Sequence, residues 1–206
     1  VTQRRKGLKA FFFKKKLSIN LNRMREFSIV SVSLLNLIIT IRYCWLLYKG
    51  AIKPALAMWV FFTIAVGMSL ITYLAKDNFS IWDNILNTTD LILVLTVSIA
   101  IAIWGDKSSK FTKFDRGCLI AVIVAILFWA ITQNHLITNL SIQLIMVVSY
   151  FPVIKRLFES KENTEPFSVW ILMMLVPVFS LISCKGMLAT IYSVRAIVCV
   201  GLLLLL

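Results

Sequence analysis

Three charged residues lie within long apolar runs of the sequence: Arg42, Asp90 and Arg195. A charged side chain at membrane depth costs roughly 2.5–3.5 kcal/mol on insertion scales, so it marks a functional site unless it has a structural partner. Arg195 is the strongest candidate, because its guanidinium stays charged and lies near the middle of its run. It would bind an anionic or carbonyl-bearing solute, or pair with Asp90 or a backbone carbonyl. Asp90 is also a good helix cap, and Arg42 would snorkel to an interface.

Uncharged polar and aromatic residues complete the set of candidates. Asn36 needs an interhelical partner or a substrate contact in lipid. The tryptophans at 59 and 170 would face each other across a symmetry axis or anchor the chain at the interfaces. Pro152 and Pro177 would be hinges or fixed kinks. The candidate substrate-binding residues are therefore Arg195, Tyr192, Ser193, Thr96, Ser98, Asn36, Trp59 and Trp170.

Catalytic and cofactor chemistry finds little support in the sequence. The single histidine, His135, has no neighbouring carboxylates, and the four cysteines form no Cys-x-x-Cys pair. Intramembrane proteolysis needs paired aspartates or a Ser–His pair at membrane depth, and the apolar runs contain neither pair. A retinal protein needs a lysine in its last helix, and the last apolar run carries Arg195 instead. We therefore expect no enzyme activity, no metal, no cofactor and no nucleic-acid partner.

The composition predicts the elements that must position these residues. The chain has 206 residues, of which 60% are hydrophobic and 15% charged. Soluble domains have roughly 45–50% apolar and 25% charged residues, so we expect an all-α membrane protein whose partner is the lipid bilayer. Seven apolar runs predict seven transmembrane helices at 27–47, 54–75, 85–104, 117–132, 136–154, 167–184 and 187–206.

An internal repeat relates the two ends of the chain. Trp59 and Trp170 are 111 residues apart, and Ser69-Leu70-Ile71 matches Ser180-Leu181-Ile182 at the same offset. Prolines precede both second helices, at Pro54 and Pro166. Two three-helix units, 27–104 and 136–206, would be joined by a linker helix at 117–132. Because that linker makes the copies parallel, we expect a 3+1+3 arrangement with its axis along the membrane normal.

Several segments resemble the SWEET/PQ-loop (MtN3-like) superfamily. They are Tyr150-Phe151-Pro152-Val153-Ile154-Lys155-Arg156-Leu157 and Asn163-Thr164-Glu165-Pro166-Phe167-Ser168-Val169-Trp170. Lys53-Pro54 with Trp59, and Trp129, look closer to uncharacterised prokaryotic seven-helix relatives. The Pro-Gln dipeptide is replaced by Pro152-Val153, and Ile41 stands where the first repeat would carry its proline. The resemblance implies a seven-helix carrier, but the mid-membrane asparagines with which SWEETs bind sugar are absent.

Basic residues predict the orientation. The loops after the first, third and fifth runs carry ten lysines and arginines: Arg42, Lys49, Lys53, Lys107, Lys110, Lys113, Arg116, Lys155, Arg156 and Lys161. The other loops carry Lys76 and Lys185. The positive-inside rule therefore places the ten in the cytoplasm of a cell (inner) membrane, with the N-terminus outside and the C-terminus inside.

Residues 1–26 conflict with that orientation, because nine basic residues and one glutamate give them a net charge of +8. One reading is a basic amphipathic helix on the inner leaflet. The other is that the native chain begins near Met24, which removes the conflict.

Two functions remain open. The first is a transporter or facilitator of a small polar solute, anionic or carbonyl-bearing, that works by alternating access between the two repeats. The second is a non-transporting membrane module, such as a receptor, assembly factor or helper subunit. A polar cavity lined by both repeats would favour the first, and a packed dry centre the second. A homo-oligomer is compatible with either.

Overall fold

The computed structural model describes residues 2–52, 54, 56–105, 113–151, 154 and 167–205. All the regular elements in this described part are helical. They are α1 (Thr2–Tyr48), α2 (Leu56–Lys76), the short 3-10 helix η1 (Ile81–Asn84), α3 (Ile85–Trp104), α4 (Lys113–Thr132), α5 (His135–Val148), α7 (Phe167–Ser180) and α8 (Met187–Leu205). The helical fold class is therefore confirmed, and Pro152 lies outside the described residues.

Length and composition make four of these helices suitable for crossing a membrane. The apolar segments are Lys14–Tyr48, Met58–Lys76, Ile81–Trp104 and Met187–Leu205. Within the described ranges, the apolar parts of α4, α5 and α7 are shorter. Many large apolar side chains on the outside of the bundle are more than half exposed, as on Ile92, Leu144 and Val198. Such an exterior is compatible with lipid around the bundle.

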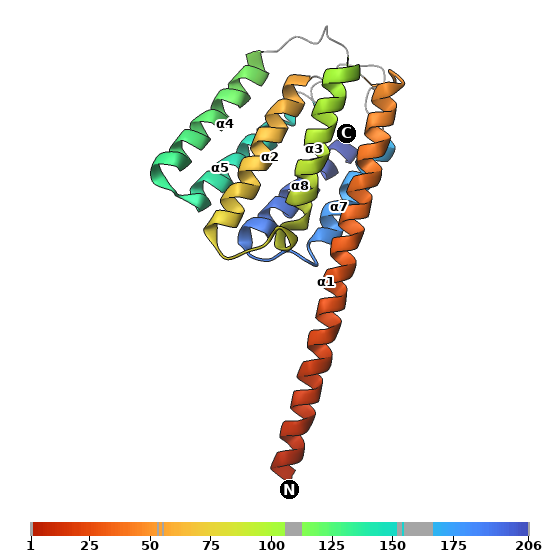
Figure 1. Cartoon of the computed structure of the whole chain (residues 1–206), viewed down its shortest axis with the longest axis vertical. Coiled ribbons are helices and arrows are strands. Elements are labelled where there is room, and N and C mark those ends of the chain that lie inside the picture. The colour runs from red at the N-terminus through yellow and green to blue at the C-terminus, as the bar shows by residue number, and fades with distance from the viewer. Residues whose placement is uncertain are drawn as a thin grey trace.

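Helix α1 is continuous through the basic N-terminal residues and projects beyond the other helices (Figure 1). Neither glycine nor proline interrupts residues 8–49, so the helix has no natural break before Gly50. Gly50 ends it in a left-handed conformation with φ of +67°. The structure therefore shows residues 2–26 as part of the same helix as residues 27–48, and not as a separate surface helix.

The helices form a ring in which neighbours along the chain are not always neighbours in space. α3 packs against both α1 and α2, and α8 packs against both α5 and α7. The ring closes because α1 packs against α7 and α2 against α5. α4 lies outside the ring against α5 and α2. Consecutive helices alternate in direction, so α1, α3, α5 and α8 run one way and α2, α4 and α7 the other (Figure 1).

A central charged cavity as the candidate functional site

A cavity of about 130 Å³ lies inside the ring. This volume accommodates several water molecules or a small solute. Most of its lining is apolar or aromatic, including Trp59 from α2 and Trp170 from α7. Among the described residues that line it, the charged ones are Asp90 and Arg195. The cavity thus combines an apolar wall with two opposite charges, which is the usual composition of a small-molecule site.

Two side chains from other helices hold the Asp90 carboxylate. The Asn36 amide of α1 donates to Asp90 Oδ1 at 2.9 Å and to Thr89 Oγ1 at 2.7 Å. The Tyr192 hydroxyl of α8 donates to Asp90 Oδ2 at 2.9 Å. The interhelical hydrogen bond expected for Asn36 is confirmed. Asp90 is not a helix cap, because the N-cap position of α3 is held by Asn84 and Asp90 lies inside the helix.

Arg195 points into the bundle and is held by uncharged groups. Its Nε donates to Gln143 Oε1 of α5 at 2.8 Å, and its Cζ lies 4.7 Å from the centroid of the Tyr192 ring. Within the described part of the chain, Asp90 and Arg195 form no direct ion pair. Tyr192 therefore separates the charges: its hydroxyl contacts the carboxylate and its ring face contacts the guanidinium, a cation–π arrangement.

A buried polar network fixes Gln143 in turn. Gln143 Nε2 donates to Ser69 Oγ of α2 at 2.8 Å. Asn139 donates from Nδ2 to the Ser69 carbonyl at 2.8 Å and to Thr72 Oγ1 at 2.9 Å. With the Asn87 amide turned so that its oxygen faces Ser69, the Ser69 hydroxyl donates to it at 2.9 Å. The network links α2, α3 and α5. It holds Gln143 in place, and Gln143 in turn accepts the hydrogen bond from Arg195.

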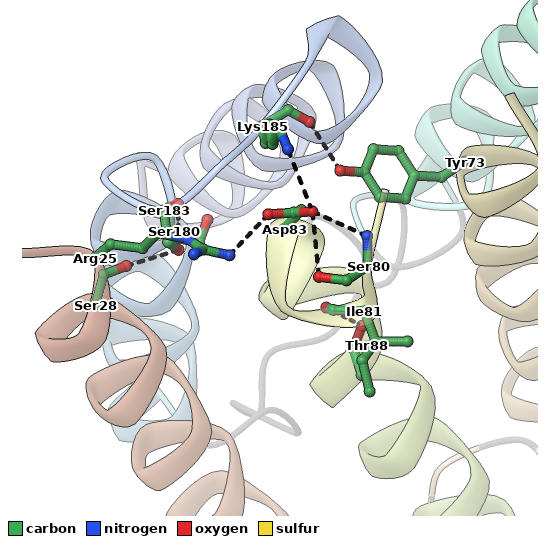
Figure 2. Close-up of polar contacts among 10 residues, drawn as sticks. All are labelled: Arg25, Ser28, Tyr73, Ser80, Ile81, Asp83, Thr88, Ser180, Ser183 and Lys185. Atoms are coloured by element: carbon green, nitrogen blue, oxygen red, sulfur yellow. Dashed lines mark hydrogen bonds and ion pairs between the residues drawn. The ribbon is translucent and has the colours of Figure 1, made fainter. Parts of the chain in front are cut away.

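The end of the bundle at which α3 and α8 begin is tied together by Asp83 (Figure 2). Asp83 Oδ1 lies 2.7 Å from Arg25 Nη2 of α1. Asp83 Oδ2 lies 3.9 Å from the Nζ atom of Lys185, which stands between α7 and α8. Oδ2 also accepts a 2.9 Å hydrogen bond from the Ser80 backbone. Tyr73 of α2 donates to the Lys185 carbonyl at 2.8 Å.

Serine hydroxyls add to this polar closure. Ser28 Oγ of α1 donates to the Phe179 carbonyl at 2.6 Å and lies 2.9 Å from Ser183 Oγ. The hydroxyl oxygens of Ser180 on α7 and Ser193 on α8 are 2.7 Å apart. The cavity lining contains none of the residues at this end. It extends instead toward the end where α2 and α7 begin, as far as Pro54 and Trp170.

The structure brings some of the candidate residues together and leaves others apart. Arg195, Tyr192, Asn36, Trp59, Trp170 and Pro177 all line the cavity. Ser193 and Ser98 are buried but do not line the cavity. The Ser193 hydroxyl contacts the Ser180 hydroxyl, and Ser98 Oγ lies 3.0 Å from Thr63 Oγ1. Thr96 is exposed on the outer face of α3. Arg42, expected at an interface, is exposed and donates to Ser168 of α7 at 2.9 Å.

Several residues around the cavity were absent from the sequence candidates. Gln143 is a polar residue within an apolar run, the same signal that selected Asn36. Gln143 acts through its hydrogen bond with Arg195, whereas Tyr150 and Tyr43 line the cavity itself. The part played by Asp83 and Arg25 depends on contacts between distant segments, and no local pattern indicates such contacts.

Comparison of the chain with protein-family models, with curated proteins and with solved structures finds no match.

Proposed function

We propose that the protein spans a membrane with seven helices and carries a small polar solute through the central cavity by alternating access. The observation that carries this proposal is the pair of unlike charges, Asp90 and Arg195, that share a cavity without neutralising each other directly. A structural pair would gain most by direct contact in a medium of low dielectric constant. Charges kept apart beside an open volume leave both available to a solute.

The packing of the ring supports two parallel repeats. Exchanging α1 with α5, α2 with α7 and α3 with α8 converts each neighbouring pair of the ring into another neighbouring pair. Trp59 and Trp170, which the 111-residue offset makes equivalent, both line the cavity. Ser69 and Ser180, equivalent at the same offset, each bond the third helix of their own triplet. This is the arrangement that parallel-repeat transporters use, with the solute at the repeat interface.

The asymmetry along the bundle supports a carrier rather than an open channel. The Asp83 contacts join η1 to α1 and to the segment between α7 and α8, and so close one end. The cavity reaches toward the opposite end, at which α1 and α3 finish, and the positive-inside rule assigns the basic sequence segments that follow these two helices to the cytoplasm. In this proposal the structure is an inward-facing state, and separation of Arg25 and Lys185 from Asp83 accompanies opening to the outside.

A non-transporting module on the same scaffold is the second candidate. The extensive buried network of Ser69, Asn139 and Gln143 favours it, because such a network would also rigidify a bundle that never moves.

Solute flux separates the two candidates. Proteoliposomes containing the full chain would be tested with a panel of radiolabelled amino acids, carboxylates and sugars. We expect uptake of at least one solute, and its loss in Arg195→Leu and in Asp90→Asn variants that still fold. Ser98→Ala is the matched control, because Ser98 is buried but does not line the cavity, and it should keep its flux. Variants that fail to fold while Ser98→Ala folds would support a structural pair.

A further inference from the structure

A second hollow of about 850 Å³ lies on the outer face of the bundle between α1 and α3. It begins near Trp82 of η1 and ends near Trp45, Tyr48 and Trp104, where α1 and α3 both finish. Leu37, Ile41 and Ile92 line it and are each more than half exposed. This groove therefore follows almost the full length of α3 and presents apolar side chains outward.

The threonines in the groove offer no free donor to a ligand. Thr40 donates to the Asn36 carbonyl at 2.7 Å, and Thr96 donates to the Ile92 carbonyl at 2.7 Å. Thr88 and Thr89 likewise donate to carbonyls one turn or more earlier in the chain, at 2.8 and 2.9 Å. Because these threonine hydroxyls already donate to backbone carbonyls, the middle of the groove suits hydrocarbon better than a polar ligand.

The two ends of the groove differ from its middle. Trp82 is about half exposed at one end, and at the other the rings of Tyr48 and Trp104 pack edge to face 5.7 Å apart, joining α1 to α3. Indole rings favour the level of lipid headgroups. At this second end the Lys49 ammonium lies 4.6 Å from the centroid of the Trp45 ring. A cation thus lies beside Trp45, a residue of the groove wall, at this end of the groove.

We propose that this groove binds a phospholipid, with an acyl chain between α1 and α3 and the phosphate beside Lys49. A phospholipid joins hydrocarbon and anionic phosphate in one molecule, in the order in which the groove presents apolar wall and cation. This charge complementarity is the reason to assign a lipid rather than a second copy of the chain. The inference depends on membrane placement and not on transport.

Asn36 makes the site more than a lipid-facing surface. It lines both the groove and the central cavity, and its amide bonds Thr89 on the groove side and Asp90 on the cavity side. A chain in the groove would therefore pack against the wall that holds the Asp90 carboxylate.

Native mass spectrometry of the full chain in detergent tests the site, with phosphatidylglycerol and phosphatidylcholine added separately. Thr96→Phe fills the groove at mid-depth. Thr190→Phe is the matched control, because Thr190 is also exposed, also bonds the carbonyl four residues earlier, and lies on α8 away from the groove. Ile92→Trp and Val198→Trp form a second pair with nearly equal exposure, 61% and 60%. Lys49→Gln removes the cation alone.

We expect wild type, Thr190→Phe and Val198→Trp to retain one phosphatidylglycerol, and Thr96→Phe and Ile92→Trp to lose it. Lys49→Gln should lose the preference for phosphatidylglycerol over phosphatidylcholine while still binding the latter. Equal retention by Thr96→Phe and Thr190→Phe, together with equal retention by the tryptophan pair, would overturn the proposal. So would a dimer that dissociates only in the groove-filling variants, because a second copy would then occupy the groove.

Discussion

Replacing Tyr192 by phenylalanine isolates the hydrogen bond that Tyr192 donates to Asp90. The ring would stay beneath Arg195, 4.7 Å from its guanidinium, while the 2.9 Å contact with the carboxylate is lost. A hydrogen bond to a charged group contributes about 1.5–3 kcal/mol, and one between neutral groups about 0.5–1.5 kcal/mol. We therefore expect Tyr192→Phe to lower the free energy of unfolding by about 2 kcal/mol.

Tyr73→Phe is the matched comparison, because Tyr73 is as buried as Tyr192, at 0% and 1% exposure, and donates to a neutral carbonyl. We expect it to cost about 1 kcal/mol. Both variants would be unfolded reversibly in mixed micelles under the same conditions. Equal costs, or a larger cost at Tyr73, would refute the reasoning that Asp90 is a charged acceptor held by Tyr192.

Three further predictions concern the closed end and the N-terminal helix. Gly186→Ala should destabilise the fold by about 1–3 kcal/mol, because Gly186 has φ of +80° and an added Cβ would lie 2.8 Å from Phe79; an unchanged melting temperature would contradict this. Asp83→Asn should cost about 1–3 kcal/mol, measured against Asp77→Asn at an exposed site, and equal losses would argue against the closure in Figure 2. A chain shortened to begin at Met24 should unfold at the same temperature as the full chain in a thermal scan, because the side chains of residues 14–24 are exposed.

Much of the helical pattern follows from hydropathy alone. The apolar runs predict α3 and the starts of α7 and α8 to the residue, and α2 and α4 within a few residues. The criterion works because a helix that spans a bilayer must be predominantly apolar over about 20 residues. It fails at the N-terminus of α1, because no helix-breaking residue separates the charged segment from the apolar one and the helix continues.

The candidate site is only partly readable from the sequence. Arg195 and Asn36 could be found because an isolated polar residue within an apolar run needs a partner. The polar residues 87–90 favour Asp90 as a cap, whereas in the structure the polar start of α3 lies in η1, whose last residue, Asn84, holds the N-cap position. Thr96 and Ser98 were not separable by sequence, since the face of a helix that meets the cavity depends on how its neighbours pack.

Accessibility of the cavity from the two sides of the membrane tests the central claim most directly. In a variant lacking the native cysteines, a single cysteine at Met173 would lie in the cavity, and one at Leu175 on the same helix would be 42% exposed toward the outside of the bundle. A small charged methanethiosulfonate would be applied to right-side-out and inside-out vesicles. A carrier predicts modification at position 173 from both sides, with none at 175. Modification at 173 from one side only, or from neither, would contradict alternating access.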